Sequence, residues 1–372
     1  MQQRQTVAKD HAVHDETATL SRRVLDFLQT HHGDGWSLLM EGRQPAGGTL
    51  ALQDLNDLIY CLYFMSWPVQ PGASSYGALA SYLQSVRLAG GLNGDAGAVP
   101  VGVHGTAYTL GALALLKAEG QDLFENILTP ATWRFDDLID GKTMLPRWPA
   151  QWSHHNWRVS HWIGGSLSIL RELSRHMPNA CRTAGAPAIE PVLEAADQLI
   201  DARSGVLKCY RSRLLQMAFR GAYRLRHDPT LGDIGGVVHL HWVNYAEDRD
   251  FKAGDRLFDL ARGAMLEHRP FMESVPFCLD FDVVQIVRAA MPVDLDETEH
   301  AALKSRALAY ALDIASYLDA HLGPAYPLHK LPGALATMHE CALIDRSISL
   351  GDLGLTVNGD HPRDIMKEIS WL

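Results

Sequence analysis

Residues 104–116 read His-Gly-Thr-Ala-Tyr-Thr-Leu-Gly-Ala-Leu-Ala-Leu-Leu, a polar beginning that runs into a stretch rich in leucine and alanine. The stretch 280–287, Asp-Phe-Asp-Val-Val-Gln-Ile-Val, is built in the same way. Residues 157–173 and 339–350 follow the same plan. A helix that is apolar on nearly all of its faces is buried between other elements. The pattern therefore predicts buried helices that begin with polar residues able to act in catalysis or binding.

A second kind of helix is amphipathic. Within 297–321, Leu303, Leu308 and Leu312 recur at helical spacing and Arg306 lies among the charged residues of the other face. The two kinds alternate at intervals of roughly 50 residues, which predicts hairpins that close into an inner and an outer ring. We expect the helices at 18–30, 55–66, 76–88, 106–119, 159–176, 191–202, 210–227, 237–248, 254–267, 283–291, 297–321 and 338–350.

Two turns connect this pattern with a known architecture. Residues 201–207, Asp-Ala-Arg-Ser-Gly-Val-Leu, resemble the D-x-x-T-G-x-x turn before an inner helix of the (α/α)6-toroid enzymes, and residues 90–94, Gly-Gly-Leu-Asn-Gly, resemble their glycine-rich turns. The resemblance is architectural, spans most of the chain and identifies no single family. It implies an all-α fold, an (α/α)6 toroid of the carbohydrate-active type, in which the N-terminal ends of the inner helices converge on one pocket. A shared fold does not by itself fix function.

The composition excludes several classes of protein. The chain has 372 residues, 47% hydrophobic and 20% charged, as in globular domains. Its formal net charge of -10 argues against the basic surface that nucleic acids and anionic membranes require. No apolar run approaches the ~18 residues of a membrane span. We therefore expect no nucleic-acid partner and no membrane span.

The cysteines and the first residues bear on location and domain organisation. Residues 1–17 are polar and lack the apolar core of a signal peptide, so we expect a disordered or loosely packed segment there. Residues 18–372 contain no long flexible linker and are expected to form a single catalytic domain. The five cysteines are scattered and form no CxxC pair, which indicates free thiols in a reducing compartment. We expect a cytoplasmic protein.

Asp280 and Asp282 are the first candidates for catalysis. They interrupt an apolar stretch, so at least one is expected to be shielded from water, and a shielded carboxyl suits a general acid or base. A helix N-cap is the alternative reading. Glycoside hydrolysis needs a second carboxyl, for which Glu340 and Glu247 are available.

The densest polar and aromatic cluster is 153–158, Ser-His-His-Asn-Trp-Arg. Its His155 and Asn156 resemble the Asn-His segment of (α/α)-barrel polysaccharide lyases, in which such residues neutralise a uronate and remove its α-proton. The resemblance implies that Asn156 and His155, together with Tyr245, are available for elimination. A loop that caps the mouth of the barrel is the alternative reading.

Histidines supply a third possible chemistry. His239 and His241 lie two residues apart, so on a helix they point to different faces and joint metal binding is disfavoured. Either one, paired with His339, could serve as the two bases of an epimerase. The remaining candidates are expected to bind substrate: His104, Tyr108, Asn156, Trp157, Arg158, His161, Trp162, Trp242, Asn244, Glu247 and His339.

Residues 136–140, Asp-Asp-Leu-Ile-Asp, form a literal DDxxD motif. Class I terpene synthases and prenyltransferases use this pattern to hold Mg²⁺ against a diphosphate, and on a helix Asp136 and Asp140 would share a face with Asp137 beside them. Asp280-Phe281-Asp282 also faintly resembles the DxDD acid of class II cyclases, but the second acidic pair is missing. The usual second metal motif is not evident either.

The candidate residues favour a saccharide as substrate. A terpenoid cyclase needs an apolar, aromatic cavity, whereas histidines, carboxylates and an arginine beside tryptophans suit hydroxyl groups and sugar rings. We therefore predict a carbohydrate-active enzyme, a glycosidase-like hydrolase that acts on an oligosaccharide or glycoconjugate, with no cofactor and no metal. The alternatives are a lyase or epimerase, a terpenoid enzyme with Mg²⁺ at Asp136, Asp137 and Asp140, and a non-catalytic helical binding protein.

Overall fold

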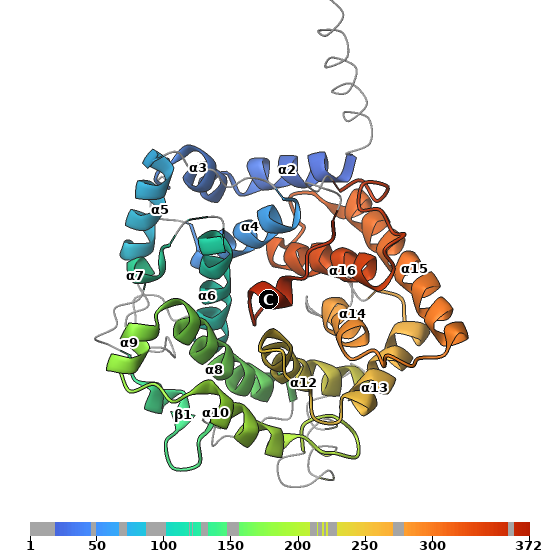
Figure 1. Ribbon diagram of the computed structural model, residues 1–372. Helices are drawn as coiled ribbons and strands as arrows, with labels where there is room; N and C mark the ends of the chain where they lie inside the picture. The colour runs from blue at the N-terminus through green and yellow to red at the C-terminus, as the bar shows by residue number, and fades with distance from the viewer. Residues whose placement is uncertain are drawn as a thin grey trace, which may run out of the picture. The chain divides into compact units, whose positions relative to one another are not determined.

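The computed structural model describes residues 19–45, 50–66, 73–86, 102–118, 120, 122–127, 133–146, 156–208, 214, 218, 221, 229–270, 279–355 and 361–372. The segment 1–17 lies outside the described residues. Almost all of the described elements are helices, so the predicted all-α class is confirmed (Figure 1). The chain divides into two compact units: unit 1 takes in 1–75, 269–281 and 296–364, and unit 2 takes in 76–268, 282–295 and 365–372.

Unit 1 contains two layers of helix. In the first layer, α4 packs against α16, and nearly every residue of both helices is buried. The two run in the same direction, because Asp57 lies 2.8 Å from His329 just before α16 and the Phe64 carbonyl lies 2.9 Å from His339 within it. The outer layer packs α2 against α3 and α15. The bounds are α2 Thr19–His31, α3 Gly33–Glu41, α4 Leu52–Phe64, α15 Glu297–His321, η4 Leu328–Lys330 and α16 Leu331–Ile344.

Unit 2 contains the longer run of buried helices. Its elements are α6 Gly102–Ala118, α7 Phe124–Ile127, η2 Phe135–Asp137, β1 Ile139–Asp140, β2 Leu145–Pro146, α8 Asn156–His176, α9 Pro178–Thr183, α10 Ile189–Ala196, η3 Asp197–Leu199, α12 Pro229–Ala246, α13 Gly254–Glu267 and α17 Ile365–Glu368. Helix α5 (Ala73–Ser85) enters this unit at residue 76, and α14 (Leu279–Ala289) enters it at residue 282. The two short strands pair antiparallel, with Ile139 opposite Pro146.

The buried helices of unit 2 run side by side in the same direction. Helix α8 packs between α6 and α12. Gly164, near the middle of α8, faces His239 of α12, and farther along α8 the Arg171 guanidinium donates to the Ala246 carbonyl at 3.1 Å. Helix α14 runs beside α12 in the same direction, because His241 contacts Gln285 and Tyr245, one turn later on α12, contacts Arg288. Neighbouring helices can be parallel in this way when the helix that connects them along the chain lies in a second layer.

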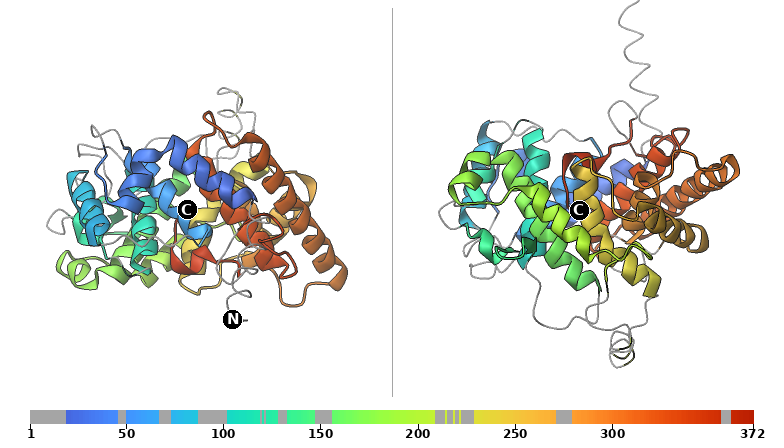
Figure 2. Two further views of the ribbon diagram at one scale, coloured as in Figure 1. Left: turned by 90° about the horizontal axis from the view of Figure 1, so that it is seen from above. Right: turned by 60° about the horizontal axis from the view of Figure 1, so that its bottom comes forward.

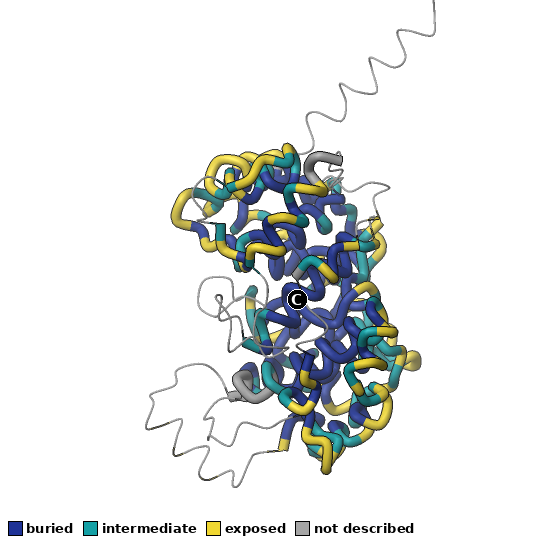
Figure 3. The backbone as a smooth tube through the Cα atoms, turned by 90° about the vertical axis from the view of Figure 1, so that its left-hand side faces the viewer, coloured by how far each residue is buried: buried dark blue, intermediate teal, exposed yellow. Residues whose placement is uncertain are grey.

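The returning helices cover the buried ones. Helix α10 packs on α8 and α13 packs on α12, each on the outer side within unit 2 (Figures 1 and 2). The tube coloured by burial shows buried residues along the inner helices and exposed ones on turns and outer helices (Figure 3). Within the described residues, no helix is long and apolar enough to cross a membrane.

Helices with clear end signals match their expected bounds. Helix α15 spans Glu297–His321 as predicted, because the Asp296 side chain caps it by accepting from the Thr298 and Glu299 amides at 2.8 and 3.3 Å. Helix α13 also has its expected bounds. On α15, however, Leu308 and Leu312 are 43% and 48% exposed, so the apolar face was only partly predicted. Of the helix expected at 210–227, only residues 214, 218 and 221 are described, and these are helical.

Two buried helices begin seven or eight residues earlier than expected, and this corrects the predicted geometry. Helix α12 begins at Pro229 rather than at 237, and α16 begins at Leu331 rather than at 338. Proline at the first turn of a helix costs no hydrogen bond, and burial offsets the low helix propensity of the glycines that follow. His239, His241, His339 and Glu340 therefore lie in the middle or second half of their helices and not at the beginnings.

Candidate functional site

Helix α12 presents its two histidines to different surroundings, as their spacing predicted. The His239 ring is T-shaped against His161 at a centroid distance of 5.1 Å and stacked on Trp371 at 4.3 Å. The His241 imidazole instead lies 3.1 Å from the Gln285 side chain. Helix α12 therefore carries a candidate site on each of two faces.

On the first face, unit 2 brings together three of the predicted histidines. His104 of α6 stacks on His161 of α8 at 4.6 Å, and Trp371 donates its indole hydrogen to His104 Nδ1 at 3.2 Å. Trp242 packs against His239 with ring centroids 4.8 Å apart. We call this group, formed by His104, His161, His239, Trp242 and Trp371, the imidazole–indole cluster. Tyr108 adjoins it, stacked 6.3 Å from His104.

A pair of glycines on α8 makes the cluster possible. A Cβ added at Gly164 would lie 2.3 Å from the Cβ of His239, and one added at Gly165 would lie 2.7 Å from Val103 of α6. Because real Cβ atoms do not approach this closely, only glycine allows α6 and α12 to pack so near to α8. His161 precedes Gly164 by one turn, so the close approach also sets its ring against His239.

The protonation state of this cluster follows from burial. Burial, aided by the neighbouring His161 and His104, holds the pKa of His239 well below its ordinary value. The ring is therefore neutral at pH 7. Because His104 Nδ1 accepts the Trp371 indole hydrogen, a neutral His104 carries its own proton on Nε2.

The second face of α12 opens on a cavity of ≈ 590 Å³ within unit 2. Aromatic and charged side chains line it together: His241, Tyr245, Asp248, Arg249, Phe251 and Lys367 are among them. Two non-glycine residues of the loop after α12, Asp248 and Ala253, hold left-handed φ values of 54° and 59°. Such conformations cost energy and are concentrated at functional sites. We call this space the Tyr245 cavity.

Two cations hold Tyr245. Arg288 donates to the Tyr245 hydroxyl at 2.8 Å, and its guanidinium carbon lies 5.1 Å from the ring centroid. The Lys367 ammonium lies 4.0 Å from the same centroid and donates to the Tyr245 carbonyl at 3.0 Å. Lys367 also pairs with Asp248, and this hydrogen bond keeps the pKa of Asp248 below its ordinary value. Tyr245 therefore has one cation at its hydroxyl and another over the face of its ring.

His241 closes the inner side of the cavity as a neutral ring. Burial lowers its pKa from 6.5 to about 4, Gln285 partly opposes this shift, and Arg288 adds to it. The Gln285 Nε2 atom is fully buried and has no hydrogen-bond partner among the described residues. His241 can therefore orient a ligand by hydrogen bonding, and it stays uncharged at pH 7.

The two predicted site residues of α16 belong to unit 1. His339 Nε2 lies 2.9 Å from the Phe64 carbonyl, and His339 Nδ1 accepts from the Arg363 amide at 2.9 Å. Both ring nitrogens are thus used by the backbone, and burial lowers the pKa of His339 to about 3. These two bonds favour a structural role for His339 over the predicted roles in binding substrate and as an epimerase base.

Unit 1 also holds two of the predicted carboxylic acids. Asp280 is 4% exposed and accepts from the Tyr310 hydroxyl at 3.2 Å, while Glu340 is fully buried. Burial raises the pKa of the Cys341 thiol, and the charges of Glu340 and Asp280 raise it further, so both acids lie near that sulfur. Burial and Asp280 likewise raise the pKa of Tyr310. Both acids are well shielded from solvent.

Other predicted residues of unit 2 have structural partners. Asn244, predicted to bind substrate, is buried, donates to the Leu240 carbonyl at 2.8 Å and accepts from Arg249. Glu247 pairs with Arg171 at 2.7 Å rather than facing another candidate acid. Asp282 is 2% exposed, one turn before Gln285 on α14.

The remaining predicted residues lie at the beginning of α8. Trp162 is half-buried in the second turn. Asn156, Trp157 and Arg158 form the first turn, and only their backbone is described. His155 lies outside the described residues.

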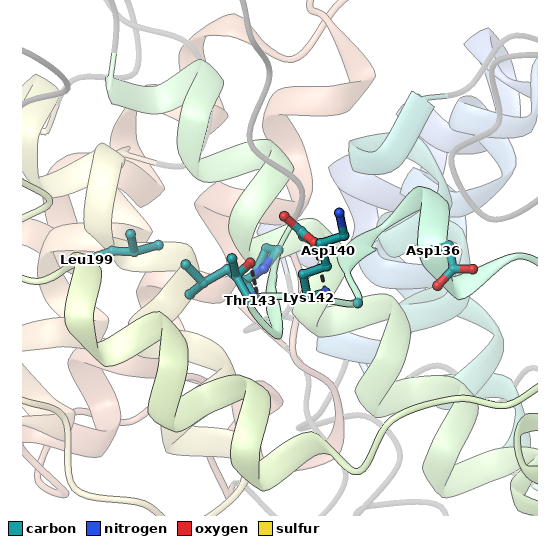
Figure 4. A pocket seen from close by; sticks show the side chains of 8 residues that line it. Asp136, Asp140, Lys142, Thr143 and Leu199 are labelled. Atoms are coloured by element: carbon teal, nitrogen blue, oxygen red, sulfur yellow. Dashed lines mark hydrogen bonds between the residues drawn. The ribbon is translucent and has the colours of Figure 1, made fainter.

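The DDxxD motif does not form the helix that its reading as a Mg²⁺ site requires. Asp136 and Asp137 belong to the 3-10 turn η2, whereas Asp140 belongs to strand β1 and accepts from the Lys142 amide at 2.9 Å. Asp136 and Asp140 line a cavity of ≈ 710 Å³, in which Figure 4 shows Asp136 set apart from Asp140, Lys142 and Thr143. The prediction that one helical face aligns the acids for Mg²⁺ is therefore wrong. Among the described residues, no three His, Cys, Asp or Glu side chains are arranged to hold a metal ion.

Sequence reasoning missed four residues of these sites. Trp371 and Lys367 come from a short segment with no helical periodicity, so no pattern marked them. Gln285 and Arg288 follow Asp282 at intervals of three residues, and this spacing could have placed all three on one face of α14.

Comparisons with protein-family models, with curated proteins and with solved structures found no match for this chain. The candidate function therefore depends on the geometry of the two faces of α12.

Proposed function

We propose that this chain is a cytoplasmic carbohydrate-active enzyme that acts on an oligosaccharide or glycoconjugate in the Tyr245 cavity. The parallel buried helices of unit 2 and the two layers of each unit support the further proposal of an (α/α)6 toroid with a single catalytic domain. The cavity volume of ≈ 590 Å³ falls in the range of small-molecule sites. Aromatic rings beside donors and acceptors suit sugar rings and their hydroxyl groups.

The observation that carries the proposal is the position of Tyr245 between Arg288 and Lys367. A phenol that accepts from a guanidinium and faces an ammonium is prepared to act as a base. Carboxylates of the cavity wall, such as Asp248, are already committed to cations. Proton abstraction by Tyr245 is therefore the reaction that this cavity favours among the carbohydrate chemistries.

In the proposed reaction, Tyr245 removes the proton next to the carboxylate of a uronate residue. The C–H electron pair forms a carbon–carbon double bond, the neighbouring C–O bond to the leaving sugar breaks, and the departing oxygen takes up the proton that Tyr245 has removed. Lys367 can pair with the substrate carboxylate in place of Asp248 and stabilise the developing negative charge. Neutral His241 offers a hydrogen bond to a sugar hydroxyl.

A panel of oligosaccharides tests this function. The purified chain is incubated with uronate-containing and with neutral oligosaccharides, and two products are followed. Elimination creates a double bond conjugated with the carboxylate, which absorbs in the ultraviolet, whereas hydrolysis creates only new reducing ends. We expect the ultraviolet signal with uronates. Reducing ends without that signal would contradict elimination, and no product from any member of the panel would contradict the carbohydrate function.

Hydrolysis is the second candidate, and Asp280 and Glu340 favour it. Both carboxyls lie near Cys341, and a shielded acid of this kind can act as a general acid. Hydrolysis predicts that Asp280→Asn abolishes the release of reducing ends from neutral oligosaccharides while Tyr245→Phe retains it. Elimination predicts the opposite dependence on these two substitutions.

A further inference from the structure

A single segment of unit 2 contributes residues to the sites on both faces of α12. This segment, residues 365–372, is here called the α17 segment. Its Trp371 stacks on His239 and donates to His104, while its Lys367 faces the Tyr245 ring. The segment packs on α12 through α17. Whatever fixes its position therefore sets the geometry of the imidazole–indole cluster and of the Tyr245 cavity together.

Glu172 of α8 is the residue that fixes the segment. Its Oε1 atom accepts from the Ser370 amide at 3.1 Å, from the Ser370 hydroxyl at 2.8 Å and from Arg171 at 2.6 Å. The Ser370 hydroxyl also contacts the Ser168 hydroxyl at 2.8 Å. Glu172 is fully buried and Ser370 is too. Three of these bonds join α8 directly to Ser370 of the α17 segment, the residue next to Trp371.

The charge of Glu172 is maintained by its neighbours. Burial would raise the pKa of Glu172, but His176, Arg171 and Ser370 together lower it below its ordinary value. Arg171 extends the network, because it also donates to Glu247 at 2.7 Å and to the Ala246 carbonyl at 3.1 Å at the end of α12. The network thus joins α8, α12 and the α17 segment.

A buried ion pair adds little net stability compared with apolar packing, so its stability alone does not explain its presence. The hydrogen bonds that Glu172 accepts are directional, and two of them come from Ser370. We infer that Glu172 is a positioning residue that holds the α17 segment so that Trp371 completes the imidazole–indole cluster and Lys367 faces Tyr245. The part of this inference that concerns catalysis rests on the proposed function.

The test measures the position of Trp371 without reference to activity. Each of the nine tryptophans contributes one indole N–H resonance to a ¹⁵N spectrum, and Trp371→Phe identifies the resonance of Trp371. Glu172→Gln keeps the shape of the side chain and removes the charge. Asp319→Asn is the matched control, because it removes a carboxylate that pairs with Arg23 on an exposed surface of unit 1.

We expect Glu172→Gln to shift or broaden the Trp371 resonance, since its bond to His104 is disturbed, and Asp319→Asn to leave it unchanged. Ser370→Ala removes one hydroxyl and is expected to cause a smaller shift. An unchanged Trp371 resonance in folded Glu172→Gln overturns the inference. If Glu172→Gln does not fold, an unchanged resonance in Ser370→Ala overturns it and a shift supports it.

Turnover supplies the second readout. We expect Glu172→Gln to lower kcat/KM about 10- to 100-fold, because a small misplacement of a binding group has effects of this size. Glu172→Gln and Lys367→Met should change kcat and KM in the same way. The double variant should lower kcat/KM little more than either single variant does, as expected for residues that act through one contact. Additive effects would contradict the coupling. If the native protein turns over no oligosaccharide, the proposed function fails, whereas the Trp371 resonance still decides the positioning role.

Discussion

Gly164 of α8 lies directly against His239 of α12, so closely that a Cβ at Gly164 would come within 2.3 Å of the Cβ of His239. The contact places His161, one turn earlier on α8, at a ring distance of 5.1 Å from His239. The backbone approach of two parallel helices is therefore the physical origin of the imidazole–indole cluster.

Gly164→Ala tests this origin. The added methyl group has no room, so we expect the free energy of unfolding to fall by roughly 1–3 kcal/mol, the usual effect of overpacking a core. Gly263→Ala is the matched control, because a Cβ at this position of α13 meets nothing within 4 Å. That control should be neutral or stabilising by up to about 1 kcal/mol. Urea unfolding measures both, and equal effects would mean that the close approach is not required.

His241 should make stability depend on pH. Its pKa falls from 6.5 to about 4 on folding, so the unfolded chain binds its proton more readily than the folded chain does. The contribution of neutral His241 is complete above pH 6.5 and decreases as the pH falls, with a loss of about 3 kcal/mol by pH 4. Urea unfolding from pH 7 to pH 4 should therefore show a shallower loss of stability for His241→Gln than for the native chain. Identical pH dependence would show that His241 is not desolvated.

Tyr310 should stabilise unit 1 through Asp280. Tyr310→Phe leaves the shielded Asp280 carboxyl without this donor, so we expect a loss of about 1–3 kcal/mol in the free energy of unfolding. Tyr76→Phe removes a hydroxyl that bonds the Asp122 carbonyl at 2.8 Å on the surface, where water can replace it. Thermal unfolding compares the two variants. A larger effect at Tyr76 would contradict the burial of the Asp280 contact.

Sequence patterns predicted the fold class and the amphipathic helices well. Helix α15 has a polar face and a capping Asp296, so both its ends could be read. Helices α12 and α16 are buried on nearly all faces and have no polar stripe to mark their length, so their beginnings were placed seven or eight residues too late. The opposite faces of His239 and His241 follow from the helical period alone, and that prediction was confirmed.

The candidate site could be predicted only in part, for a related reason. His104, His161 and His239 were predicted as site residues because they are polar residues within apolar helices, and unit 2 brings them together. The partners of Tyr245 come from α14 and the α17 segment, and no local pattern connects positions 245, 288 and 367. Such contacts between distant segments arise from packing, which periodicity does not encode.

The most direct test of the central claim is the ultraviolet assay of elimination with the native chain, Tyr245→Phe and Asp280→Asn. The fold should tolerate loss of the Tyr245 hydroxyl, because Tyr245 is half-buried and lines the cavity. If Tyr245 is the base, Tyr245→Phe should lower the rate at least about 100-fold, the usual contribution of a general base, while Asp280→Asn retains most of it. Full elimination activity in Tyr245→Phe, or its loss only in Asp280→Asn, would contradict the account.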